Sequence, residues 1–181
     1  MNHLGTKILY SERLILRRFL ESDAAELYEG YVNQESFLYY ANKQKRSLEE
    51  QRNSLKGIEE KYENLEYYNW LIILKSNNKI IGSINLNIDN YNESIQFNYA
   101  IDDRYKGNGY MTEALECVKK FCLEELKVNR LYGGCEINNI ASKKVMEKCN
   151  FNYEGTLRNY LKLGDGYHDM LLYSFIRGRD N

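Results

Sequence analysis

The chain has 181 residues, a length typical of one compact domain, and 43% of them are hydrophobic and 28% charged. It has 25 lysines plus arginines and 26 aspartates plus glutamates, a net charge of -1. A nucleic-acid-binding protein of this size usually has a positive excess, so we expect no nucleic-acid partner. The sequence has no apolar run of membrane-spanning length and no apolar signal segment near Met1, so we expect a cytoplasmic protein without a membrane partner.

Cysteine and histidine patterns do not indicate a metal site. The cysteines form no CxxC pair, and the histidines, His3 and His168, are far apart in the sequence. We expect free, mostly buried cysteines that behave as small apolar residues. They are Cys117, Cys122, Cys135 and Cys149.

The first third of the chain predicts a strand and two helices. Apolar residues alternate over residues 13–17, which is typical of a strand. Ser22 and Asp23 offer an N-cap for a first helix, and residues 47–50 have the spacing of a capping box that opens a second helix. Between the helices, residues 33–46 are aromatic, polar and irregular, which suits a flap that faces a substrate. Its aromatic residues include Phe37, Tyr39 and Tyr40.

Strands dominate the pattern after residue 67. The first three, joined by short turns, are predicted to be antiparallel. The predicted elements are strands over residues 70–74, 79–86 and 95–101, a helix over 111–126, a strand over 130–137, a helix over 140–149, and strands over 151–163 and 168–176.

The segment over residues 102–114 has the features of an anion site. Gly107 and Gly109 allow a close approach of the backbone to a ligand, and Lys106 adds positive charge. The first turn of the following helix offers unpaired N–H groups, which suit a phosphate or pyrophosphate. The simpler alternative is a glycine-containing turn before an amphipathic helix. A Walker A motif is absent, and Thr112 stands where a dinucleotide fingerprint needs a third glycine.

This segment resembles motif A of the GNAT N-acetyltransferases. In one frame the match begins at Arg104; in the other, KGNGYMTEA from Lys106 is similar to the RGKGYATEA run of the RimJ/RimL-like branch, the ribosomal-protein-alanine N-acetyltransferase type. Further matches in order are ERLILR from Glu12 with Asp23-Ala24, IIGSI from Ile80, NIASKKVMEKCNF from Asn139, Glu154-Gly155, and residues 166–174. Asn150 replaces a usual glycine, and Asn tolerates a left-handed φ.

The resemblance implies an α/β (α+β) fold, the GNAT fold. It implies a mixed, mostly antiparallel central sheet of about seven strands flanked by about four helices, in the order β-α-α-β-β-β-α-β-α-β-β. It also implies that residues 1–181 form a single N-acetyltransferase domain. Similar proteins often have a proline before the anion loop, where this chain has Asp103, so Asp102, Asp103 and the glycines must set the turn.

The resemblance further implies acetyl-CoA as cosubstrate, bound where the fourth and fifth strands splay apart. The fourth strand would pair with pantetheine, the loop would bind the pyrophosphate, and Asn139 would contact the pantetheine arm or simply cap its helix. The implied cofactor-binding residues are Tyr99, Ala100, Ile101, Lys106, Gly107, Asn108, Gly109, Tyr110, Met111, Thr112, Asn139 and Ser142.

The resemblance also makes Ser142 the candidate catalytic acid, or stabiliser of the leaving thiolate, as in the RimJ/RimL-like branch. Many members of the wider superfamily have a tyrosine acid where this chain has Met146, which cannot donate a proton. The general base stays unassigned among Glu66, Glu136 and Tyr99, and either glutamate could be a plain surface carboxylate.

The implied reaction is transfer of an acetyl group to a primary amine by direct attack in a ternary complex. We expect the acceptor to be a protein N-terminal α-amine, as in ribosomal-protein enzymes. The alternatives are a small amine, such as a polyamine, an antibiotic or an amino-acid-like compound, and a CoA-binding module without catalysis. The sequence does not identify the acceptor or the general base, and it does not decide whether the protein is catalytically active. It also leaves the oligomeric state open, although homodimers are common among similar proteins.

Overall fold

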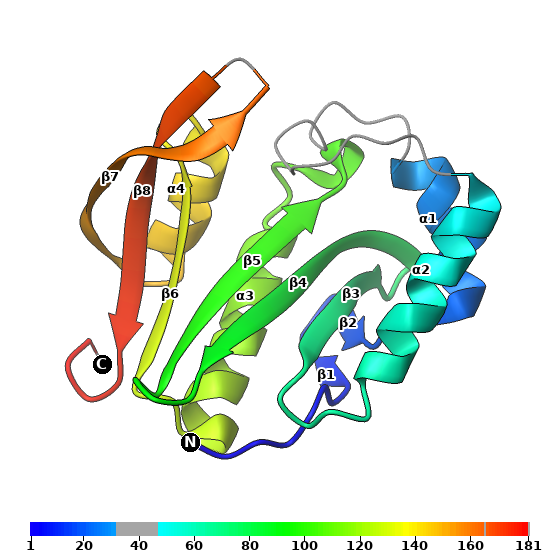
Figure 1. Cartoon of the computed structure of the whole chain (residues 1–181), viewed down its shortest axis with the longest axis horizontal. Coiled ribbons are helices and arrows are strands. Elements are labelled where there is room, and N and C mark those ends of the chain that lie inside the picture. Colours follow the sequence, from blue (N-terminus) through cyan, green and yellow to red (C-terminus); the bar gives the residue numbers. More distant parts are fainter. Residues whose placement is uncertain (32–46, 165, 181) are drawn as a thin grey trace.

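The computed structural model describes residues 1–31, 47–164 and 166–180 (Figure 1). The predicted flap over residues 33–46 lies outside the described residues. The strands are β1 (Leu9–Tyr10), β2 (Leu14–Arg17), β3 (Tyr68–Leu74), β4 (Lys79–Asp89), β5 (Ser94–Ile101), β6 (Arg130–Glu136), β7 (Asn152–Leu163) and β8 (Gly166–Ile176). The helices are α1 (Ala24–Tyr31), α2 (Leu48–Lys61), α3 (Tyr110–Phe121) and α4 (Ile140–Lys148).

The strands form one sheet in the order β1-β2-β3-β4-β5-β6-β8-β7, in which only β5 and β6 are parallel. This architecture confirms the predicted fold class and element order. The described residues form an 8-stranded sheet instead of about seven strands. The added strand is β1, which has 2 residues and is too short to show an alternating pattern in the sequence.

The two predicted helix starts differ in outcome. Ser47 and Glu50 form the predicted capping box of α2. In contrast, a 3-10 turn over Glu21–Asp23 precedes α1, so Ser22 does not cap it. The Asp23 carboxylate instead accepts hydrogen bonds from the Leu20 N–H and the Arg17 guanidinium, and thereby fixes the chain between β2 and α1.

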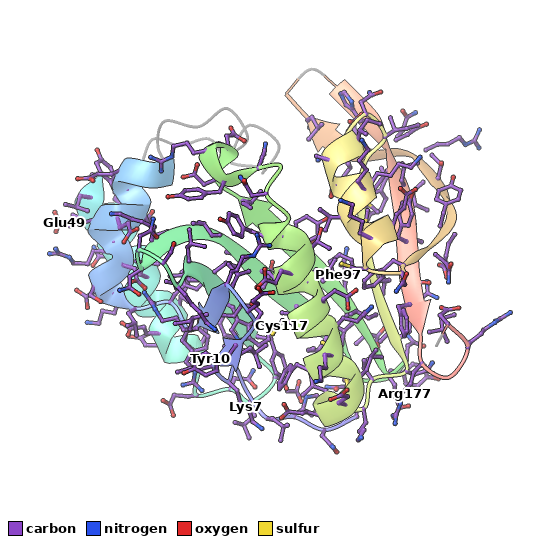
Figure 2. The ribbon with its side chains drawn as sticks, turned by 180° about the vertical axis from the view of Figure 1, so that it is seen from behind. Lys7, Tyr10, Glu49, Phe97, Cys117 and Arg177 are labelled. Carbon is purple, nitrogen blue, oxygen red and sulfur yellow. The ribbon has the colours of Figure 1, made fainter. Side chains whose placement is uncertain are left out.

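Each face of the sheet packs against its own helices. Along β3, Trp70 and Ile72 belong to the main core with α3 and α4, whereas Leu71 and Ile73 form a second cluster with α1 and α2. This alternation follows from the two-residue period of a strand. Figure 2 views the first face, with α3 and α4 in front of the sheet and Phe97 labelled between them.

The sheet splits between β5 and β6. The two strands pair only from Ser94–Gln96 to Arg130–Tyr132, although β5 pairs with β4 along its whole length and β6 with β8 likewise. Beyond this pairing Phe97 lies against Gly133, where a Cβ atom would come within 2.4 Å of the Phe97 ring. The strands diverge from there (Figure 1), which confirms the predicted splay of the fourth and fifth strands. Within the described residues, no helix is long and apolar enough to cross a membrane.

Candidate active site

A cavity of about 1050 Å³ lies between the diverging ends of β5 and β6. Its walls come from β5, the loop before α3, the first turn of α3, the end of β6, α4 and the β7–β8 hairpin. It is lined by every residue that the sequence assigned to the cosubstrate except Asn108, namely Tyr99, Ala100, Ile101, Lys106, Gly107, Gly109, Tyr110, Met111, Thr112, Asn139 and Ser142. The fold therefore brings three segments that are distant in the sequence to one cavity: the end of β5, the loop that leads into α3, and the start of α4.

The anion loop, which contains Gly107 and Gly109 and leads into α3, has the geometry of an anion site. Gly107 and Gly109 both adopt φ 79°, and Gly109 is the N-cap of α3. The first hydrogen bond into the helix runs from the Glu113 N–H to the Gly109 carbonyl, at 3.0 Å. Among the described residues, the N–H groups of α3 before Glu113 have no backbone acceptor. The residues that carry these N–H groups line the cavity at the positive end of the helix dipole, which suits binding of a phosphate group.

Aspartates set the turn before this loop, as the sequence predicts. Asp102 is 4% exposed and accepts hydrogen bonds from the Arg104 N–H, at 2.9 Å, and from its guanidinium. Asp103 forms an ion pair with Lys106. The turn is thus fixed by side-chain acceptors rather than by a proline ring.

Asn108 shapes the loop from outside the cavity. Its side-chain amide donates to the Tyr105 carbonyl at 3.2 Å and to the Lys106 carbonyl at 3.0 Å. Its own carbonyl accepts a hydrogen bond from Arg13 Nη1 at 3.1 Å. Asn108 therefore holds the backbone of its neighbours in position.

Arg13 and Glu113 brace the loop, a pairing that sequence reasoning missed. Glu113 accepts hydrogen bonds of 2.7 Å from the Arg13 N–H, the Arg13 Nε and the Ser11 hydroxyl. Burial by itself would raise the pKa of Glu113, but these donors outweigh it and the pKa is lowered. The Arg13 guanidinium also lies over the Tyr110 ring, 4.5 Å from its centroid. Both residues lie in quoted motifs, but nothing in either motif indicates a contact across 100 positions.

Tyr99 and Ser142 meet across the splay. The Tyr99 hydroxyl lies 2.7 Å from the Ser142 hydroxyl and donates to the Ser142 carbonyl at 3.2 Å. Asn139 caps α4 by accepting from the Ser142 N–H at 3.0 Å, which confirms its predicted capping role. Two coupled hydroxyl groups can pass a proton to a group bound between the strands. Met146 is buried in the core and takes no part.

Cys135 lines the cavity beside this pair but is a poor nucleophile. Burial is the main cause that raises its thiol pKa, and a hydrogen bond with Ser142 lowers it only in part. All four cysteines are free and all but Cys117 are buried, as predicted. In the described part of the chain, no group of three or more His, Cys, Asp or Glu could hold a metal ion.

The two glutamates considered as bases lie at opposite ends of the sheet. Glu136 lines the cavity, is 9% exposed and accepts hydrogen bonds from the Asn138 N–H and side-chain amide. Glu66 instead accepts from Asn90 in the β4–β5 turn at 3.1 Å and lies 3.6 Å from His3. Because that turn precedes the paired end of β5, Glu66 lies away from the cavity.

Two further cations face the cavity from α4. Lys144 and Lys148 are one helical turn apart and both line it. Together with Lys106 of the loop before α3 they add positive charge to the cavity lining, which suits a ligand with several negative charges. A lysine-rich helix face is common on protein surfaces, so the sequence carried no specific signal for these two.

Comparison with known proteins agrees with this geometry. Residues 13–152 match the family described as "Acetyltransferase (GNAT) domain". The chain is 27% identical over 163 residues, 89% of its length and 87% of the relative's, to "Probable N-acetyltransferase YjcK" of Bacillus subtilis (strain 168). It is 24% identical over 172 residues, 93% of its length and 96% of the relative's, to the "Ribosomal-protein-serine acetyltransferase" of Escherichia coli (strain K12).

A solved structure with the same fold is that of RimL, the "Ribosomal L7/L12 alpha-N-protein acetyltransferase", in complex with coenzyme A. It superposes with a TM-score of 0.82 at 24% identity and covers 94% of this chain and 98% of that one. At this identity the likeness concerns the fold. The family match extends over most of the chain and includes both sides of the splayed strands, and we conclude that this chain belongs to the GNAT acetyltransferase family and is an N-acetyltransferase.

Proposed function

We propose that the chain transfers the acetyl group of acetyl-CoA to the N-terminal α-amine of a protein, by direct attack in a ternary complex. We also propose that residues 1–181 form the single domain that does so. The observation that carries the proposal is the cavity at the splay. Among the described residues, one of its walls has helix N–H groups without a backbone acceptor and another has the Ser142–Tyr99 pair.

Residues of this chain would hold acetyl-CoA at three places. The loop from Lys106 to Thr112 would bind the pyrophosphate through its N–H groups and the lysine charge. The end of β5, which has no β6 partner after Gln96 among the described residues, would pair its backbone with pantetheine. Asn139 would add a side-chain contact from the N-terminus of α4.

The chemistry would fall to Ser142, supported by Tyr99. When bound, acetyl-CoA supplies the acyl group as a thioester. The Ser142 hydroxyl would give a proton to the departing sulfur, and Tyr99 would hold that hydroxyl in place through their 2.7 Å contact. A backbone N–H at the splay would stabilise the charge that develops on the carbonyl oxygen. No covalent enzyme intermediate is needed, which agrees with the cysteine thiols, whose pKa values are all raised by burial.

The acceptor class rests on the relatives. A ribosomal-protein-serine acetyltransferase matches nearly the whole chain, and a ribosomal-protein enzyme has the same fold. Met146 argues against the polyamine enzymes, which often keep a tyrosine acid at this position. An N-terminal amine is also easier to deprotonate than a lysine side chain, because its pKa is roughly 7.7–8.0 rather than about 10.4.

The experiment is thiol release from acetyl-CoA with a panel of amines. The panel holds hexapeptides that begin with serine or alanine, the same peptides with a blocked N-terminus and an internal lysine, and spermidine. We expect release only with free N-terminal peptides. Faster release with spermidine would indicate a small-amine enzyme. Calorimetric binding of acetyl-CoA without release from any amine would indicate a non-catalytic CoA-binding module.

A further inference from the structure

The end of β6 presents different chemistry on its two faces. Cys135 faces α4, with its sulfur 3.8 Å from the Asn139 carbonyl, so Glu136 faces the opposite side of the sheet. A short turn, closed by a hydrogen bond of 2.9 Å from the Asn139 N–H to the Glu136 carbonyl, leads from β6 into α4. This turn fixes the Glu136 carboxylate on one face and Ser142, in the first turn of α4, on the other.

The cavity reaches both faces. On β5, Tyr99 contacts α4, so Gln96 and Asn98 face away from that helix. These two residues line the cavity together with Glu136. A group that lies between the strands is therefore bordered by hydroxyl groups on the α4 face and by a carboxylate and amides on the opposite face.

The Glu136 carboxylate is held in one orientation. It accepts hydrogen bonds from the Asn138 N–H at 2.8 Å and from the Asn138 side-chain amide at 3.0 Å. Nδ1 of His168, on the adjacent strand β8, lies 3.4 Å from its Oε1. The His168 side chain is 26% exposed whereas that of Glu136 is 9% exposed, so the imidazole connects a buried carboxylate with solvent.

We propose that Glu136 is the catalytic base, which receives the acceptor ammonium on the face opposite α4, and that His168 is a positioning residue that passes the proton on to solvent. The inference rests on the proposed function and names a residue for a role that it leaves unassigned. A carboxylate that borders the cavity attracts a cationic amine as well as its proton, which suits an N-terminal ammonium group.

The protons and electrons balance as follows. The ammonium group loses one proton to Glu136, and the freed lone pair on nitrogen forms the C–N bond to the thioester carbonyl carbon. The C–S bond breaks with its electron pair on sulfur, which takes a proton from the Ser142 hydroxyl. Ser142 regains a proton from solvent, and the second proton of the nitrogen leaves to solvent. The products are the amide, the free thiol and one proton in all.

The pH dependence of this site involves other titratable groups of the cavity. Asp169, next to His168 on β8, does not line the cavity, and its carboxylate accepts a hydrogen bond from the Asn159 N–H. The remaining titratable side chains that line the cavity come from β5, the anion loop, α3, β6, α4 and β7, and they are Tyr99, Tyr105, Lys106, Tyr110, Cys135, Lys144, Lys148 and Tyr160. In this described lining Glu136 is the only carboxylate.

The test is the pH profile of kcat/KM for Glu136→Gln, with acetyl-CoA and a hexapeptide that begins with serine. An α-amine with a pKa near 8 is about 1% neutral at pH 6 and mostly neutral at pH 9. We expect the variant to lose about 100-fold at pH 6 and less than about threefold at pH 9, because solvent then deprotonates the amine instead. Calorimetric affinity for acetyl-CoA should stay within about twofold of the wild type.

Three companion variants separate the role in catalysis from a structural role. Glu66→Gln removes a carboxylate at the other end of the sheet and should match the wild type at every pH. Glu136→Asp keeps a base, so it should lose activity by a factor that does not vary with pH. His168→Asn should show a deficit of about three- to tenfold that is also largest at pH 6.

Two results would overturn the inference. One is wild-type activity of Glu136→Gln at pH 6, and the other is a loss that is equal at pH 6 and pH 9. If Glu136→Gln does not fold, a pH-dependent loss in Glu136→Asp as steep as that expected for Gln would overturn it instead. If the wild type releases no thiol with any amine, the proposed function fails and this inference fails with it.

Discussion

The two ends of β5 have different neighbours. At Ser94–Gln96, β6 pairs with the strand in parallel, and the backbone groups satisfy one another. From Asn98 to Ile101 the same edge borders the cavity. The closed end is thus part of the core, and the open end borders the cavity with polar side chains and with a strand edge that β6 does not pair among the described residues. A single strand supplies both, because a backbone that is not paired within the sheet is available to a ligand.

A glycine is needed at the closed end of β5 and another at the open end, for different reasons. Gly133 has no side chain because the Phe97 ring occupies that space, and the ring in turn stacks on Tyr99, with their centroids 5.9 Å apart. At Gly109 an added Cβ atom would lie 3.5 Å from Arg13 Nη2, an ordinary contact distance, but the backbone is left-handed. The closed end therefore depends on packing and the open end on backbone conformation, and variants can break each separately.

The largest effect should come from the open end. Replacing Gly109 with valine imposes a strained φ and turns the first N–H groups of α3 away from the cavity. We expect calorimetric affinity for acetyl-CoA to fall by at least about 1000-fold with the fold retained by circular dichroism. Gly178→Val is the matched control, since Gly178 also has a left-handed φ of 77° but lies outside the cavity. Unchanged affinity in the Gly109 variant would contradict the assigned pyrophosphate site.

The next largest effect concerns the hydroxyl groups of Tyr99 and Ser142, which meet between β5 and α4. Ser142→Ala should lower kcat by about 100-fold while affinity for acetyl-CoA changes little, because the hydroxyl acts on the leaving sulfur. Tyr99→Phe should lower kcat less. In the double variant, the tyrosine change should add almost nothing, since it acts through Ser142. Additive losses would show that the two residues work independently.

At the closed end the effect should fall on stability. Gly133→Val places a side chain within 2.4 Å of the Phe97 ring, which cannot move freely because it also packs on Phe151. We expect a loss of about 2 kcal/mol, seen as a Tm lower by about 4–8 °C. Gly57→Ala on α2, where a Cβ meets nothing within 4 Å, is the control and should not lower Tm. An unchanged Tm for the Gly133 variant would show that the strands separate without this packing.

The smallest effect tests the brace behind the anion loop. Glu113→Gln should cost about 1 kcal/mol at pH 7 by urea unfolding. The pKa of Glu113 is lowered in the fold, so its contribution is complete above the ordinary value of 4.5 and disappears as the pH falls through the folded value. The difference between wild type and variant should therefore shrink below pH 4.5. A difference that is the same at pH 7 and at strongly acid pH would contradict the ionic role.

The sequence by itself determined the elements and the loop chemistry. Periodicity and caps predicted most helices and strands to within a few residues, because these signals are local. Asn150 has the left-handed φ of 58° that its place in the motif suggested. The glycines and aspartates of the anion loop behave as predicted, since φ preferences and Asx capping depend on neighbours only. The resemblance to the GNAT family, carried by the order of the motifs, then predicted which segments share a cavity.

Only the tertiary structure decided which partners meet. The pairs Arg13–Glu113 and Tyr99–Ser142 join segments 100 and 43 positions apart, and no local pattern encodes such contacts. The same holds for the two glutamates, which look alike in sequence. Strand register places Glu66 at the closed end of the sheet and Glu136 in the cavity beside His168. The sequence gives the chemistry of each side chain, but the residues that it contacts depend on how distant strands pair and where that pairing ends.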